Sequence, residues 1–162
     1  MSACEITGFG THLKVASIEK SRTFYESLGF KLVFGYGDEA FRASLPDGVA
    51  SAPEKYRGLT FEISDSANFE IAEDHIAIKD KSVSSLKIHT PKISAMVRVK
   101  SLVPLFENPN ITISFPVRKY YWGTIEAAFR DPDGYVLVFI APFSDKELAA
   151  VEKHVDVEEV KP

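Results

Sequence analysis

The sequence predicts an α+β fold made of two similar modules, each with the element order βαβββ. At 162 residues the chain has the length of one ordinary domain. Near its start, strand-type alternation over residues 11–16 gives way to a helical pattern over residues 17–30. The run Val15-Ala16-Ser17-Ile18 then has a counterpart in Val99-Lys100-Ser101-Leu102. Such internal duplication indicates two modules packed around a shared face, so residues 1–162 are expected to form a single domain.

The first module is expected over about residues 9–64. Ser17 is a favourable N-cap for its helix, and Gly29 suits the left-handed position that ends a helix. Pro46-Asp47-Gly48 suits a type I turn and is matched with Pro132-Asp133-Gly134 of the second half. The remaining strands of this module are predicted at residues 31–36, 40–45 and 59–63.

The second module is expected over about residues 93–142, after a connecting segment at 65–92 with local strands at 74–78 and 85–88. Its helix, at 102–107, should be short because Pro104 lacks an amide hydrogen. Ser144 and Glu147 form a capping box that starts a terminal helix, which could dock on the body or on a partner subunit. The acidic tail at 156–162 is expected to fray. Strands of the second module are predicted at residues 93–99, 110–118, 124–129 and 135–140.

Composition restricts the partners and the compartment. A net charge of −4 disfavours nucleic acid, whose binding depends on concentrated Lys and Arg. No apolar run approaches the ~20 residues of a membrane helix, so no membrane partner is expected. Cys4 is the single cysteine, and the first residues lack the basic and apolar regions of a signal peptide. These features favour a reducing cytoplasm.

Several motifs of both modules resemble those of a known family. They are Leu13-Lys14-Val15, Phe24-Tyr25, Leu28-Gly29-Phe30, Trp122-Gly123 and Arg130-Asp131-Pro132-Asp133-Gly134. In this order they are similar to the glyoxalase/bleomycin resistance/dioxygenase, or vicinal oxygen chelate, superfamily over about residues 9–142. The resemblance implies paired βαβββ modules that form a half-open curved sheet around a small-molecule cavity. It also implies a homodimer.

The resemblance further implies one divalent metal in catalytic members, held by the first and last strands of each module. The four ligand positions fall at Gly10, Glu62, Ser94 and Val138, of which only Glu62 offers a usual ligand. We therefore expect no cofactor. The alternative is an atypical metal site using His12 and Glu62, since His12 follows Gly10 by two residues on the same strand face.

Strand parity selects the candidate ligand-binding residues. Gly10, His12, Thr60 and Glu62 should share one inward face, and Ser94, Met96, Val136 and Val138 another. Carboxylates in apolar strands are paired, hydrated or in a cavity, so Glu62 and Glu126 are also catalytic candidates. The alternative for Glu62 is a structural ion pair, and the alternative for Glu126 is a position that faces solvent. The aromatic run before Gly123 could stack on a ligand, form a packed corner or make a dimer contact. The ligand-binding candidates are His12, Glu62, Met96, Tyr121, Trp122, Glu126 and Val138.

These observations favour a metal-independent protein that sequesters a planar or cationic small molecule, such as an antibiotic or a metabolite. A metal-dependent lyase, isomerase or dioxygenase that uses His12 and Glu62 is the first alternative. An enzyme that uses Glu62 or Glu126 as a general base without metal is the second.

Overall fold

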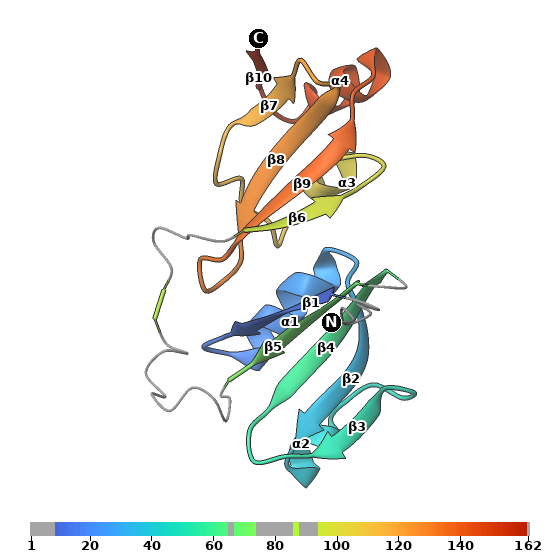
Figure 1. Cartoon of the computed structure of the whole chain (residues 1–162), viewed down its shortest axis with the longest axis vertical. Coiled ribbons are helices and arrows are strands. Elements are labelled where there is room, and N and C mark those ends of the chain that lie inside the picture. Colours follow the sequence, from blue (N-terminus) through green and yellow to red (C-terminus); the bar gives the residue numbers. More distant parts are fainter. Residues whose placement is uncertain (1–8, 65–66, 74–85, 88–93, 162) are drawn as a thin grey trace, which may run out of the picture. The chain divides into compact units, whose positions relative to one another are not determined.

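The computed structural model describes residues 9–64, 67–73, 86–87 and 94–161. It divides into two units, residues 1–86 and 87–162, and each contains one curved five-stranded sheet that does not close (Figure 1). The elements of the first unit are β1 (Phe9–Lys14), α1 (Ile18–Ser27), β2 (Lys31–Gly37), α2 (Glu39–Ala43), β3 (Ala50–Pro53), β4 (Gly58–Ser64) and β5 (Ala67–Ala72). Those of the second are β6 (Ser94–Arg98), α3 (Val103–Phe106), β7 (Val117–Tyr120), β8 (Thr124–Arg130), β9 (Val136–Pro142), α4 (Asp145–Val151) and β10 (Val157–Val160).

Both sheets have the same topology. Their strand orders are β1-β5-β4-β2-β3 and, read from the other edge, β6-β9-β8-β7-β10. In each, the first and last strands of a βαβββ module run parallel side by side, and the last three strands are antiparallel neighbours. A fifth strand, β3 or β10, adds to the edge in parallel with the module's second strand. The α+β fold with paired βαβββ modules is thereby confirmed.

The helix α1 forms and ends as its sequence predicts. The Ser17 side chain accepts from the Lys20 amide at 3.3 Å, and Gly29 takes a φ of 87° after the last turn. Its buried face presents Tyr25, whose ring centroid lies 4.5 Å from that of Phe69 on β5 and 6.0 Å from that of Phe61 on β4. The apolar core of the first unit therefore lies between α1 and one face of the sheet.

The module helix of the second unit, α3, is shorter than α1, and this unit also has a terminal helix, α4. Pro104 stands in the first turn of α3, which ends at Phe106, as predicted. Phe106 packs on Phe129 of β8, with their ring centroids 6.4 Å apart. The Phe129 ring in turn packs on Phe139 of β9, with centroids 5.9 Å apart. Within α4, Val151 is fully buried, so this terminal helix docks on its own unit.

Three predictions for the elements of the first unit were wrong. Residues 39–43 form α2 rather than a strand, because Asp38 caps the Phe41 amide at 2.8 Å and the segment is rich in helix formers. The last strand of the module is β5, not residues 59–63, so the module continues past residue 64. Pro46-Asp47-Gly48 lies between α2 and β3 and is not the counterpart of Pro132-Asp133-Gly134, which joins β8 to β9.

Two predictions for the second unit were also wrong, and one lies outside the described residues. Residues 110–116 contain an isolated bridge from Ile113 to Phe129, and the strand itself starts at Val117. Residues 157–160 pair with β7 instead of fraying. The strands expected at 74–78 and 85–88 fall almost wholly outside the described residues.

Candidate functional site

Each sheet has a face that its module helix leaves uncovered, here called its open face. On β4 and β5, Phe61 and Phe69 contact α1, so by alternation Thr60, Glu62 and Glu70 lie on the open face of the first sheet. On β8, buried Ile125, Ala127 and Phe129 alternate with less buried Thr124, Glu126, Ala128 and Arg130. The second group lies on the open face of the second sheet.

On the open face of the first sheet, His12 and Glu70 lie opposite each other on β1 and β5. His12 Nε2 is 3.4 Å from Glu70 Oε1, and their side chains are 30% and 33% exposed. The Tyr36 hydroxyl, from β2, donates to the same Glu70 oxygen at 2.6 Å. The Lys14 ammonium lies 2.8 Å from His12 Nε2. We call His12, Lys14, Tyr36 and Glu70 the His12–Glu70 cluster.

Electrostatics fix the roles of two members of this cluster. Burial and the hydrogen bond to Glu70 raise the pKa of the Tyr36 phenol well above its ordinary value, so Tyr36 remains a donor. An ammonium can only donate, so His12 Nε2 accepts from Lys14 in its neutral form. If His12 is protonated, the same nitrogen donates to Glu70 instead and repels Lys14.

Glu62 lies on the same open face but does not join this cluster. It faces Asn68 of β5 and pairs with Lys31 at 3.3 Å, and its side chain is 41% exposed. Because β5 separates β4 from β1, Glu62 and His12 stand on strands about 10 Å apart. The structure therefore brings His12 together with Glu70 and not with Glu62. The alternating run Asn68-Phe69-Glu70-Ile71 was the sequence signal that could have identified Glu70.

On the open face of the second sheet, Glu126 is the polar centre of an aromatic surface. Its Oε1 accepts from Thr124 Oγ1 at 2.8 Å and from Trp122 Nε1 at 3.4 Å. The Trp122 ring stacks on Tyr120 with centroids 4.2 Å apart, and Tyr121 meets its edge at 4.9 Å. Trp122 and Tyr121 are 55% and 60% exposed. Tyr121, Trp122 and Glu126, which the sequence predicts to bind a ligand, thus lie together.

Met96 and Val138 lie opposite each other on β6 and β9, at the positions that His12 and Glu70 hold in the first sheet. Val138 also faces Ala128 of β8, which places it on the open face of the second sheet. Met96 is 66% exposed. A thioether and an isopropyl group therefore replace the imidazole and carboxylate of the first sheet.

The donor set does not fit the four-ligand metal centre implied by the resemblance. A catalytic divalent metal takes three or more nitrogen, oxygen or thiolate ligands. The first sheet supplies only His12 and Glu70 at these positions, and Met96 and Val138 add neither a carboxylate nor an imidazole. Among the described residues, no group of three or more His, Cys, Asp and Glu side chains is close enough to share a metal.

The family model of the glyoxalase/bleomycin resistance protein/dioxygenase superfamily matches residues 10–139 of the chain. The chain belongs to this superfamily. No curated protein is similar enough in sequence to count as a match.

Solved structures of superfamily members share the fold. A glyoxalase/bleomycin resistance protein/dioxygenase from Nocardioides is 18% identical, with a TM-score of 0.54, and the match covers 90% of this chain and 87% of that one. Glyoxalase I from Zea mays is 20% identical over 83% of this chain and 44% of its own, with a TM-score of 0.58. The fosfomycin resistance protein FosX from Listeria monocytogenes, complexed with Mn(II) and sulfate, is 14% identical over 90% and 99%, with a TM-score of 0.53. At these identities the structures establish a common fold and not a common activity.

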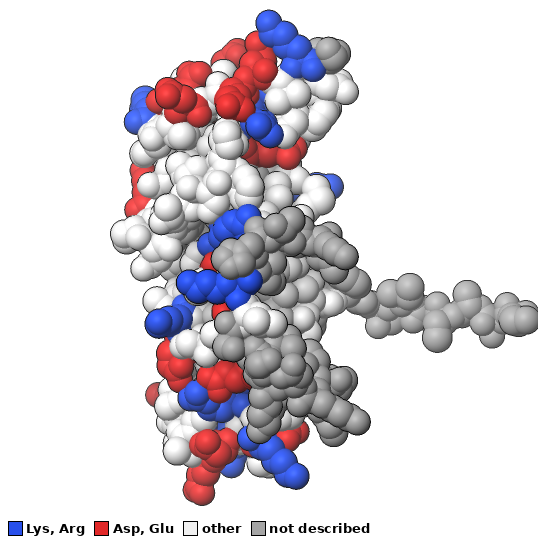
Figure 2. Space-filling model, turned by 90° about the vertical axis from the view of Figure 1, so that its left-hand side faces the viewer, with Lys and Arg blue, Asp and Glu red and all other residues white. Residues whose placement is uncertain are grey.

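Charge and hydropathy add two observations on partners. In the face shown in Figure 2, Lys and Arg side chains are interspersed with Asp and Glu, unlike the basic stripe that nucleic-acid backbones bind. Within the described ranges, no helix combines the length and the apolar character needed to cross a bilayer.

Proposed function

We propose that this superfamily member binds and sequesters a planar or cationic small molecule on its open sheet faces, without a metal. The observation that carries the proposal is the exposed Trp122–Tyr121 surface beside the Glu126 carboxylate. Aromatic faces stack on planar rings and attract cations, and a carboxylate adds a charge-assisted hydrogen bond. An antibiotic-like molecule or a metabolite of this kind is the proposed ligand.

The His12–Glu70 cluster supports a metal-independent role. The lone pair of His12 Nε2 is directed at the Lys14 ammonium, and a Glu70 oxygen at the Tyr36 hydroxyl. A neutral imidazole nitrogen has one lone pair, so a metal bound at His12 Nε2 would have to displace Lys14. His12, Glu62, Met96 and Val138 are proposed to contact the ligand and not a metal.

Trp122 is the single tryptophan of the chain and reports directly on the proposed site. Bleomycin, which has a planar cationic tail, should quench its fluorescence saturably. Glu126→Gln keeps the shape of the side chain but removes its charge, and should weaken binding by about 1–3 kcal/mol, roughly five- to 150-fold. Glu152→Gln, at the exposed end of α4, is the matched control and should bind as wild type does. Equal binding by both variants would refute the role of Glu126.

The alternative is a metal-dependent lyase, isomerase or dioxygenase, and it is favoured by one observation, the His12–Glu70 pair on adjacent strands. The candidate metal ligands are then His12 and Glu70, in place of the predicted His12 and Glu62. Metal analysis of protein purified without chelator distinguishes the two functions. A stoichiometric divalent metal that is lost in His12→Ala would overturn the metal-independent proposal.

We also propose a homodimer, because the resemblance implies that a second chain covers the open cavity. The single cysteine supports the further proposal of a cytoplasmic location. Light scattering at micromolar concentration should give twice the monomer mass of 18.0 kDa. A monomer mass would contradict this proposal without affecting the ligand proposal.

A further inference from the structure

The first unit contains a pocket that involves none of the open-face residues named above. It has a volume of about 280 Å³ and is lined by residues of α1, by α2 with its flanking residues and by Arg57. Ligand pockets in proteins typically start at about 300 Å³, so this volume suits a molecule of one ring with a short side chain. All of its lining residues belong to the first unit, so the pocket does not depend on the second.

One wall of the pocket is apolar. Ala40 and Phe41 of α2 contribute hydrocarbon surface, whereas Ile18 of α1 borders the pocket but is only 1% exposed. The Arg57 guanidinium lies over the Phe41 ring, with its carbon 5.4 Å from the ring centroid. This cation–π contact fixes one face of the ring and makes Phe41 a rigid part of the wall.

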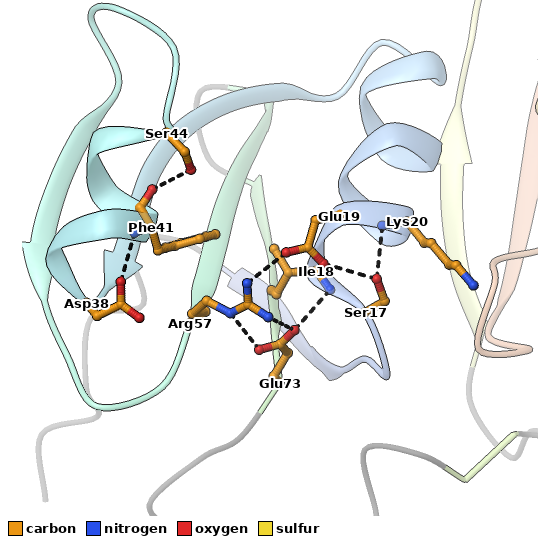
Figure 3. A network of polar contacts seen from close by, with 9 residues as sticks. All are labelled: Ser17, Ile18, Glu19, Lys20, Asp38, Phe41, Ser44, Arg57 and Glu73. Carbon is orange, nitrogen blue, oxygen red and sulfur yellow. Dashed lines mark hydrogen bonds and ion pairs between the residues drawn. The ribbon is translucent and has the colours of Figure 1, made fainter.

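The guanidinium of Arg57 is already matched with two acids. Its Nε and Nη2 donate to the two oxygens of Glu73 at 2.9 and 2.6 Å, and its Nη1 donates to Glu19 at 2.7 Å. Figure 3 shows Arg57 enclosed by Phe41, Glu73 and Glu19. A bidentate pair plus a second carboxylate leaves Arg57 poorly suited to receive an anionic ligand.

The remaining charges of the pocket lining are those of Arg22 and Asp38. Arg22 pairs with Glu26 at 3.1 Å and is neutralised by it. Asp38 caps the Phe41 amide through Oδ1 and has no ion-pair partner in the described part of the chain. The lining itself holds two carboxylates, Glu19 and Asp38, and two guanidiniums, Arg22 and Arg57. Glu26 and Glu73 pair with these guanidiniums from outside the lining, so Asp38 is the lining charge without an ion pair among the described residues.

We propose that this pocket binds a small organic cation, an ammonium carried on a single aromatic or apolar body. The body packs on Phe41 and Ala40, and the ammonium donates to Asp38 and Glu19. Arg57 acts as a positioning residue, because it holds the Glu19 carboxylate and the Phe41 ring in place. This site shares no residue with the proposed ligand surface around Trp122.

Phenethylamine is a suitable probe, and 3-phenylpropionate is an anion of similar size and shape. In a ¹H–¹⁵N NMR titration of the full chain, phenethylamine should shift the amides of Ala40, Phe41 and Ser44 and leave the Trp122 indole unchanged. The anion should shift none of them, and added salt should weaken phenethylamine binding. Shifts confined to Trp122, or equal shifts with both probes, would overturn the proposal.

Asp38→Asn keeps an N-capping side chain and removes the charge, so the fold of α2 should persist. It should raise the Kd for phenethylamine by about three- to tenfold, the loss expected for a half-solvated charge-assisted contact. Glu39→Gln removes a charge from the neighbouring exposed residue, outside the pocket lining, and should change the Kd by less than about twofold. Equal Kd values for the two variants, with matching thermal melts, would show that Asp38 does not bind the cation.

Discussion

The positions that hold His12 and Glu70 in the first sheet hold Met96 and Val138 in the second, although both sheets have the same strand order. The first open face carries a polar network around Glu70, and the second carries an aromatic surface around Glu126. Backbone pairing depends on amide groups that every residue except proline supplies, whereas the open faces are freer to vary because each module helix packs on the opposite face of its sheet. The duplicated fold therefore fixes where side chains meet, but not their chemistry.

In both modules a glutamate carboxylate accepts a hydrogen bond from a backbone amide at the start of the module helix. In the first, Glu73, which follows β5, accepts from the Ile18 amide at 3.4 Å. In the second, Glu147 of α4 accepts from the Leu102 amide at 2.7 Å and from Ser101 Oγ at 3.0 Å. Ile18 and Leu102 are counterparts in the duplication, so each module ties its helix start to the segment after its last strand. First-turn amides lack helical partners, which explains the shared solution.

The largest expected loss of unfolding free energy comes from a core substitution in the first unit, and a substitution in the second unit is the comparison. Tyr25→Ala removes a fully buried ring that contacts Phe61 and Phe69, and should reduce the free energy of unfolding by about 3–5 kcal/mol. Phe106→Ala, in the half-buried α3, should lower it by about 1–2 kcal/mol. Urea unfolding followed by Trp122 fluorescence measures the second unit. A Trp122 midpoint that Tyr25→Ala leaves unchanged would show that the units unfold independently, against the expected single domain.

A second prediction tests the tie between Glu147 and α3. Glu147→Ala leaves the Leu102 amide without its carboxylate partner and should reduce the free energy of unfolding by about 1–3 kcal/mol. Glu152→Ala, at the exposed end of the same helix, should change it by no more than about 0.5 kcal/mol. Urea denaturation of the three proteins provides the measurement. Similar losses in both variants would mean that α4 acts through helix propensity alone.

The third prediction sharpens the contrast between the open faces. Tyr36→Phe removes the hydroxyl that donates to Glu70 and should reduce the free energy of unfolding by about 1–2 kcal/mol near neutral pH. Because the folded-state pKa of Tyr36 is raised, its contribution is present below about pH 10, the ordinary value, and is lost as pH rises. Thermal melts should therefore show wild type and variant converging at alkaline pH. Tyr121→Phe, at an exposed ring of the second face, should show no such difference.

The smallest effect is expected at the strand edges. β10 is joined to β7 by exposed ion pairs, Arg118 with Glu158 at 3.0 Å and Lys119 with Glu159 at 3.2 Å. Glu158→Gln should change the free energy of unfolding by less than about 1 kcal/mol, since exposed pairs are weak and salt-screened. Melts at low and high salt measure this difference. A larger, salt-independent loss would show that β10 depends on more than backbone pairing at this edge.

The family and most elements could be predicted from local sequence. The choice of Glu62 instead of Glu70 as the partner of His12 shows what local sequence does not determine. The capping residues Ser17 and Ser144 and the helix-shortening Pro104 act within a few residues, so their effects were predictable. Residues 40–45 were assigned to a strand, and that error shifted the last strand of the module from β5 to β4. The expected ligand position then moved from Glu70 to Glu62. Parity alone could not correct it, because both residues lie on the same face.

The sequence by itself determined the duplicated βαβββ pattern, the start of α1 and α4 and the faces to which Glu62 and Val138 belong, because all of these depend on near-neighbour periodicity and caps. Only the tertiary structure decided which strands are adjacent. Strand order brings Glu70 beside His12 across 58 positions of the chain and gathers Glu19 and Glu73 around the Arg57 guanidinium. These contacts come from long-range pairing, whose register no short segment of sequence specifies.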